Sequence, residues 1–170
     1  KLELPQEGPH DLPRGITPED VFHYAYAVFG SPTYRSRYAE ALKADFPRLP
    51  LTAERKLFGA LADFGRELAG LHLGESARLD SVMTVLLGAR EPKVEKVLWS
   101  QGTVWLDKSE TYGFKGVREE VWNFQIGGYR VCEKWLKDRK GRKLSKGDIH
   151  RYERVVVAVS ETIRIMKAID

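Results

Sequence analysis

The sequence predicts an α+β domain in which helices at both ends pack around a small, mostly antiparallel sheet with a β-hairpin. Two helix starts near the N-terminus, a β-branched and aromatic stretch in the middle and a long amphipathic C-terminal stretch support this prediction. The 170 residues, 42% of them hydrophobic, are enough to form one hydrophobic core but too few to form two comfortably. We therefore expect one domain at residues 16–170, after a Pro/Gly-rich linker from a preceding domain at residues 1–15.

Two proline-containing start signals predict the first two helices. The stretch TPED at 17–20 combines an N-cap, a proline in the first turn and a capping-box acid, and predicts a helix to about residue 29. The stretch SPT at 31–33 repeats the cap and the proline. This second helix should carry Leu42 on its apolar face and end at the sequence DFPRLP.

Two longer helices are predicted from apolar periodicity. A helix beginning at Thr52 carries apolar residues at spacings of three and four, which we expect to be core: Leu57, Leu61, Phe64, Leu68 and Leu71. A capping box at Ser145 and Asp148 opens a long final helix with an apolar stripe from Ile149 to Met166. The apolar segment 76–90 fits either a helix or a buried strand.

The sheet is predicted from the middle of the chain. The runs KVEKVLW and TVWLD flank the turn SQG and indicate a hairpin, and the alternation in VWNFQI at 121–126 indicates a further strand. Gly127 and Gly128 should then lead into a short helix with Cys132 and Leu136 facing inward. These glycines could let backbone amides approach a phosphate, but a hinge that needs positive φ is the simpler interpretation.

Several classes of function find no support. One cysteine excludes an intramolecular disulfide and a cysteine zinc site, and the histidines lack metal-binding spacing, so we predict no metal site. No phosphate-binding loop, dinucleotide fingerprint or nucleophile with a base is present, so we predict no catalytic residue and no bound cofactor. Neither a signal peptide nor a long apolar run occurs, which predicts a cytoplasmic protein with no membrane partner.

Positive charge is concentrated in one stretch. The net charge is +4, yet seven cations against two acids lie between Arg130 and Lys143. A solvated charge run is one explanation, but clustering on a turn favours a mobile loop that contacts the phosphates of a polyanion. The predicted phosphate contacts are Arg130, Lys134, Lys137, Arg139, Lys140, Arg142 and Lys143.

Two further groups of polar residues are candidates for nucleic-acid contact. Long donors on the hairpin and the loop after it, about residues 100–118, could reach base edges; these candidates are Lys108, Tyr112, Lys115 and Arg118. The start of the second helix offers secondary backbone contacts, namely Ser31, Thr33, Arg35 and Arg37.

Three segments together resemble the C-terminal specificity, or target recognition, domain of the type ISP single-polypeptide restriction-modification enzymes. They are residues 16–52 (ITPEDVFHYAYAVFGSPTYRSRYAEALKADFPRLPLT), 121–145 (VWNFQIGGYRVCEKWLKDRKGRKLS) and 148–170 (DIHRYERVVVAVSETIRIMKAID). The resemblance implies a bacterial defence protein that joins a nuclease, an ATP-driven helicase-like translocase and an S-adenosylmethionine-dependent adenine methyltransferase to this domain.

On that resemblance, the chain is a DNA target recognition domain. It would bind duplex DNA sequence-specifically and present the target adenine to a methyltransferase domain outside this chain, while S-adenosylmethionine, ATP and Mg are bound by other domains. The fragment itself is then no enzyme, and its partners are DNA and the methyltransferase and helicase-like domains of the same polypeptide. A structural coupling module that docks those domains with little DNA contact is the alternative.

Overall fold

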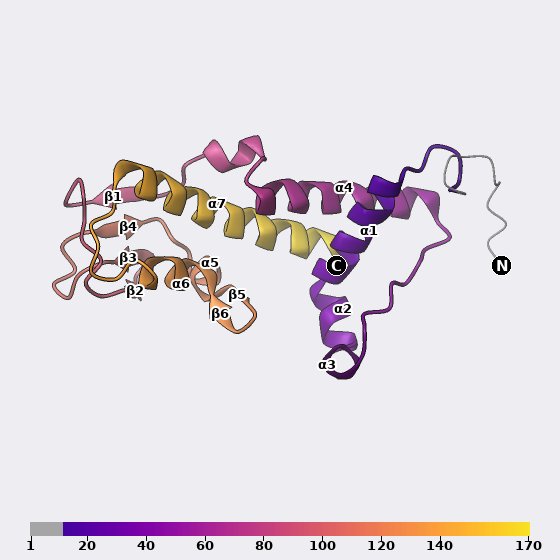
Figure 1. Cartoon of the computed structure of the whole chain (residues 1–170), viewed down its shortest axis with the longest axis horizontal. Helices are drawn as coiled ribbons and strands as arrows, with labels where there is room; N and C mark the ends of the chain where they lie inside the picture. Colours follow the sequence, from indigo (N-terminus) through magenta and orange to yellow (C-terminus); the bar gives the residue numbers. More distant parts are fainter. Residues whose placement is uncertain (1–11) are drawn as a thin grey trace. The chain divides into compact units, whose positions relative to one another are not determined.

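The computed structural model describes residues 12–170, and the chain forms two compact units. One unit comprises the residues up to Ser76 together with Thr162–Asp170, and the other comprises Ala77–Glu161. Seven α-helices and a four-stranded antiparallel sheet lie in the described part, which confirms the α+β prediction (Figure 1). The first eleven residues of the predicted linker lie outside the described residues.

Helices α1 (Pro18–Gly30) and α4 (Arg55–Leu73) cross in close contact in the first unit (Figure 1). A Cβ built on Gly65 of α4 would lie 1.7 Å from the backbone oxygen of His23 on α1. Only glycine therefore permits this approach. Around the crossing, the buried apolar side chains include Tyr24, Ala27, Ala62 and Leu68.

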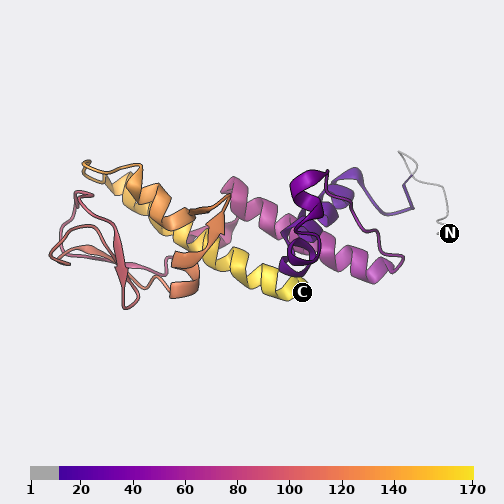
Figure 2. The same cartoon turned by 90° about the horizontal axis from the view of Figure 1, so that it is seen from below.

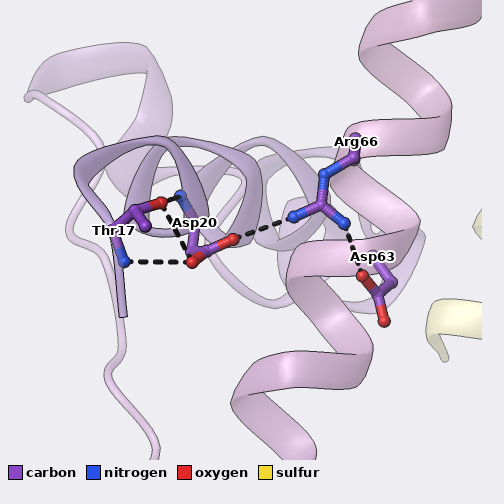
Figure 3. A network of polar contacts seen from close by, with 4 residues as sticks. All are labelled: Thr17, Asp20, Asp63 and Arg66. Atoms are coloured by element: carbon purple, nitrogen blue, oxygen red, sulfur yellow. Dashed lines mark hydrogen bonds and ion pairs between the residues drawn. The ribbon is translucent and has the colours of Figure 1, made fainter. Parts of the chain in front are cut away.

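A polar network fixes the start of α1 to α4 (Figure 3). The Asp20 amide donates to Thr17 Oγ1 at 3.2 Å and the Thr17 amide donates to Asp20 Oδ2 at 3.0 Å, which confirms the predicted capping box. Arg66 of α4 bridges Asp20 at 2.8 Å and Asp63 at 2.6 Å. The backbone hydrogen bond from Thr17 is the main cause that lowers the pKa of Asp20.

The second predicted helix is two shorter helices, α2 (Pro32–Arg37) and α3 (Ala41–Ala44). Its start is as predicted, because Ser31 accepts a hydrogen bond from the Tyr34 amide at 3.0 Å. The prediction of one continuous helix that extends to Leu42 is wrong. After α3 the chain folds back, so that Tyr34 and Tyr24 donate hydrogen bonds to the carbonyls of residues 48 and 50.

Helix α4 begins three residues later than predicted. Thr52 Oγ1 accepts from the Glu54 amide, which places this hydroxyl in a turn before the helix. Leu68 and Leu71 are buried as predicted, but Leu57 is 45% exposed and does not belong to the core. At the close crossing, Gly65 of α4 lies against the His23 backbone of α1.

The sheet of the second unit has the strand order β1-β4-β3-β2, with every pair antiparallel. Its strands are β1 (Val85–Leu87), β2 (Leu98–Ser100), β3 (Thr103–Trp105) and β4 (Gly113–Lys115). The predicted hairpin is β2–β3, and its two turn residues have φ of 45° at Gln101 and 76° at Gly102. The ambiguous segment 76–90 contains a 3-10 helix (Ala77–Asp80) and β1.

The predicted strand at 121–126 is mostly wrong. Helix α5 (Glu119–Asn123) takes its first half, and only β5 (Gln125–Ile126) is extended. Val121 and Trp122 are neighbours in sequence and both are buried, which a strand with one buried face does not allow. Gly127 and Gly128, with φ of 58° and 83°, turn the chain into β6 (Tyr129–Arg130) rather than directly into a helix.

Helices α6 (Val131–Lys137) and α7 (Lys146–Ile169) complete the fold, and α6 lies beside the first half of α7 in both views (Figures 1 and 2). The Tyr152 ring of α7 contacts Phe114 of the sheet and Trp135 of α6, with centroids 4.5 and 5.4 Å apart. Cys132 and Leu136 are fully buried, as predicted. Burial raises the pKa of the Cys132 thiol to about 12, so this cysteine is an inert core residue.

Candidate nucleic-acid interface

The basic loop after α6 is paired to another segment of the second unit. Backbone hydrogen bonds run from Val94 to the Arg142 carbonyl at 2.9 Å, from Gly141 to the Val94 carbonyl at 2.7 Å and from Leu144 to the Pro92 carbonyl at 2.9 Å. Val94 and Leu144 are buried and anchor the two segments. The expectation of a mobile loop is therefore wrong, because its backbone is held on both sides of the turn.

This pairing places Lys93 directly opposite Lys143. Side chains opposite each other in an antiparallel pair lie on the same face, where two like charges repel and are destabilising. Both lysines are exposed, as are Lys140 and Arg142 on the loop. We call these four residues the basic surface. Within residues 12–170, none of the four side chains has an acidic partner at ion-pair distance.

The surplus charge of the basic surface comes from the loop. The strand-like segment at 91–96 carries Lys93 and Lys96 against Glu91 and Glu95 and is balanced in charge. The turn has only Asp138 as an acid, and Asp138 is already paired to Lys134 of α6, with Nζ to oxygen distances of 2.5 and 2.7 Å. An anion that binds here would therefore meet cations that have no internal competitor at the turn.

The other predicted phosphate contacts already have partners in the fold or are partly covered. Lys137 pairs with Glu133 one turn earlier on α6 at 2.8 Å, and Arg130 is half-buried on β6. The Arg139 guanidinium stacks on the Trp135 ring, 3.4 Å from its centroid, and donates to the Trp135 carbonyl at 2.9 Å. With 22% of its side chain exposed, Arg139 mainly supports the loop.

Asp148, the N3 residue of the α7 capping box, also holds this arginine. Hydrogen bonds from Ser145 are the main cause that lowers the pKa of Asp148, and Arg139 contributes further. The distance from Arg139 Nε to Asp148 Oδ1 is 3.6 Å, which is an ion pair rather than a hydrogen bond. The basic loop is thus fixed at its start by Arg139 and at its end by the cap of α7.

The predicted readout loop is preorganised by one buried carboxylate. Asp107 accepts hydrogen bonds from the Thr111 amide at 3.0 Å, the Thr111 hydroxyl at 2.7 Å and the Tyr112 amide at 3.3 Å. Lys108 is exposed on this loop, whereas Tyr112 is half-buried, and desolvation is the main cause that raises its pKa. Lys108 is therefore free to reach outward from a fixed backbone.

The other two candidates for base readout differ in whether their side chains already have partners in the fold. Lys115 is exposed at the end of β4, opposite both Val85 and Thr103. Arg118 donates to the buried Ser160 of α7 at 2.6 Å and pairs with Glu120 at 2.9 Å. These two contacts give Arg118 a structural role that sequence pattern did not reveal.

One short segment links the basic loop to the readout loop. Residues 92–94 pair with the basic loop, and the next amides, Glu95 and Lys96, donate to the Leu106 carbonyl at 2.8 and 3.0 Å. The Leu106 amide in turn donates to the Tyr112 carbonyl at 3.1 Å. The structure therefore connects the two predicted contact regions by a continuous series of backbone hydrogen bonds. Sequence reasoning missed Lys93 because its role depends on this long-range pairing.

The secondary candidates lie in the first unit, at the start of α2. The Asp170 carboxylate occupies this position, accepting from the Ser31 hydroxyl at 2.6 Å and from the Thr33 amide at 3.1 Å. Arg35 and Arg37 are exposed. The Asp170 carboxylate thus already accepts the hydrogen bonds that Ser31 and Thr33 were predicted to donate to a DNA phosphate.

Residues 12–170 contain neither a cluster of metal-binding side chains nor a helix suited to spanning a membrane. No three His, Cys, Asp or Glu side chains there are grouped so that they could hold a metal ion. In the same part of the chain, no helix combines the length and the apolar character needed to cross a bilayer.

Comparisons with known proteins show which family and fold this chain resembles. Residues 5–168 match the family described as Type ISP C-terminal specificity domain. A comparison with curated protein sequences gives no significant match. Among solved structures, the DrdV-DNA complex is 27% identical in sequence with a TM-score of 0.71, covering 92% of this chain and 18% of that one.

Two further structures share the fold. A nuclease-deletion mutant of the Type ISP restriction-modification enzyme LlaGI, in complex with a DNA substrate mimic, is 20% identical with a TM-score of 0.67, covering 90% of this chain and 14% of that one. The ATP-dependent Type ISP restriction-modification enzyme LlaBIII bound to DNA is 17% identical with a TM-score of 0.69, covering 92% and 11%. The present chain thus spans less than a fifth of these proteins.

Proposed function

The chain belongs to the Type ISP C-terminal specificity domain family, and from this membership and the basic surface we propose that it binds duplex DNA as a target recognition domain. The observation that carries the proposal is the placement of Lys93 opposite Lys143, beside two further exposed cations without acidic partners in the described part of the chain. Such a cluster is costly by itself and is stabilised by an anion. Phosphates of a DNA backbone supply that anion.

In this proposal, the two loops linked by the series of backbone hydrogen bonds have different functions. The basic surface holds phosphates and sets the register of the domain on DNA, whereas Lys108 and Lys115 reach toward base edges. Extrusion of a target adenine costs a few kcal/mol of unstacking, and phosphate contacts of this kind help to offset it. The adenine would then be presented to a methyltransferase domain outside this chain.

A salt titration tests the proposal. Fluorescence anisotropy of the 170-residue chain with a labelled duplex should give a linear decrease of log K with log salt concentration. About four phosphate contacts predict a slope near −3.6, and each Lys→Ala change in the basic surface should flatten it by about 0.9. As a matched control, Lys56→Ala alters an exposed lysine in the other unit and should leave the slope unchanged. Absence of binding at low salt, or a flat dependence, would contradict the proposal.

We extend the proposal to the parent protein. S-adenosylmethionine, ATP and Mg are assigned to other domains of a larger cytoplasmic restriction-modification enzyme, with methylation, translocation and cleavage performed there and no catalysis by this chain. Incubation of the chain with plasmid, ATP, Mg and S-adenosylmethionine tests this assignment, since any turnover would refute it.

One observation favours the alternative role of a coupling module. An apolar groove of about 450 Å³ in the first unit is lined by residues that include Leu12, Ile16, Val21, Leu51 and Phe58. A surface of this kind suits docking of another protein domain. The two roles are distinguished by the salt titration, because a module that only docks domains would show no phosphate-dependent slope.

A further inference from the structure

The β5–β6 hairpin exposes two large apolar side chains. Ile126 and Tyr129 are opposite each other in the register and are 57% and 63% exposed. Between them, Gly127 and Gly128 form the tip, and a Cβ added at either would meet no atom within 4 Å. The tip of this ribbon therefore stands free of the rest of the described structure.

Packing within the fold does not explain these side chains. A ribbon with two residues in each strand has little stability of its own, so it gains nothing from apolar groups that remain in water. At its base, the Val131 amide donates to the Phe124 carbonyl at 3.2 Å, which closes the hairpin. Exposed apolar groups on such a projection are typical of a surface that is covered by a partner.

The charges around the hairpin indicate what kind of partner this is. Arg130 lies on β6, and the Lys134 ammonium is 5.9 Å from the centroid of the Tyr129 ring. The ribbon leads directly into α6, and the basic loop begins at the other end of this helix, roughly 10 Å away at 1.5 Å per residue. The apolar tip is therefore followed along the chain by cations, which favours a polyanion over an apolar protein surface; before the tip, Glu120 of α5 is paired with Arg118.

We infer that the β5–β6 hairpin enters a groove of duplex DNA and contacts base pairs there. The inference rests on the proposed DNA binding and adds a second reading element to it. A major groove about 12 Å wide admits a two-stranded ribbon. The register also places Gln125 opposite Arg130, and these are the side chains suited to bidentate contacts with adenine and guanine.

The two faces of the ribbon would have different tasks. Opposite residues share a face, so Gln125 and Arg130 lie on one face and Ile126 and Tyr129 on the other. The polar face can donate and accept hydrogen bonds at base edges. The apolar face can contact thymine methyl groups or the sugar wall of the groove, from which it excludes water.

The test uses the full 170-residue chain and a random pool of duplexes, from which bound sequences are selected and their dissociation constants measured. Tyr129→Ala and Ile126→Ala together should weaken binding about tenfold, about 1.4 kcal/mol, while the salt slope stays unchanged because no phosphate contact is lost. Tyr129→Phe should retain most of the affinity. Phe46→Ala, at a side chain that is 89% exposed in the other unit, is the matched control and should have no effect.

Gln125→Ala provides a second measurement that does not depend on the apolar pair. Its side chain is exposed, so the fold should persist, and the preferred sequence should become less defined at one or two positions. If the hairpin variants bind with the parent affinity and select the same sequences, while the parent keeps its steep salt slope, the inference is overturned and the proposed DNA binding stands. If the parent chain binds no DNA, both fail.

Discussion

Gly65 lies where α1 and α4 are closest, and its replacement by alanine tests the packing of the first unit. A Cβ at this position would lie 1.7 Å from the His23 oxygen and 2.5 Å from the His23 carbonyl carbon, whereas ordinary contacts begin at 3.4 Å. The obstructing atoms belong to the backbone, so no side-chain rotation relieves the clash. The two helices would have to separate by roughly 1.7 Å, which disturbs the contacts on both sides of the crossing.

The expected loss of stability follows from two opposing effects. Overpacking of a core typically costs about 1–3 kcal/mol, and a clash with backbone belongs at the upper end. Alanine gains about 1 kcal/mol over glycine in helix propensity. The Gly65→Ala change should therefore lower the free energy of unfolding by about 2 kcal/mol. Gly59→Ala on the same helix meets no atom within 4 Å and should raise it by up to about 1 kcal/mol.

Urea denaturation followed by far-ultraviolet circular dichroism measures both variants. The four tryptophans lie between residues 77 and 161, so their fluorescence reports the second unit separately: Trp99, Trp105, Trp122 and Trp135. The dichroism transition of Gly65→Ala should move to lower urea, and hydrogen exchange of the α1 amides should accelerate. Equal stability of the Gly65→Ala and Gly59→Ala variants would show that the helices do not approach as described.

Two predictions concern the second unit. The Tyr152 hydroxyl is buried without a hydrogen-bond partner among residues 12–170. In urea titrations, Tyr152→Phe should therefore leave the free energy of unfolding unchanged or raise it by up to about 1 kcal/mol. A clear decrease in that free energy would show that the hydroxyl has a partner. The hydrogen bonds from Ser145 lower the folded-state pKa of Asp148, so its contribution is full above the unfolded pKa of about 4 and is lost as pH falls through the folded value. Asp148→Asn should therefore reduce the difference in unfolding free energy between about pH 7 and pH 3, and an unchanged difference would argue against the capping box.

Three helix starts were predictable because their capping signals are local. The caps at Thr17, Ser31 and Ser145 each act on an amide three residues later, and all three are present in the structure. Segments whose sequence fits both a strand and a helix were not predictable. The sequence at 121–126 alternates as a strand would, yet Val121 and Trp122 are both buried in a short helix, α5, which contacts α6.

The candidate interface was predictable in the same limited sense. The cluster of cations after α6 is visible in the sequence, but the internal partners of Arg118 and Arg139 and the contribution of Lys93 depend on contacts between distant segments. The hairpin at residues 125–130 was missed because its register, and so the pairing of Ile126 with Tyr129, is set by a turn that was assigned to a strand-to-helix connection.

The continuous series of backbone hydrogen bonds from the basic loop to Tyr112 also bears on how such a domain could acquire a new target sequence. The loop at 107–112 lies at the far end of the series, so residues can be exchanged or inserted there without shifting the pairing of Lys93 with Lys143. Under the proposed division of function, general affinity for DNA and the part of sequence choice that depends on Lys108 are carried by parts of the chain that can change independently. A recombinant that exchanges only this loop would inherit its phosphate contacts and the contacts of the β5–β6 hairpin from one parent, and the base contacts of the loop from the other.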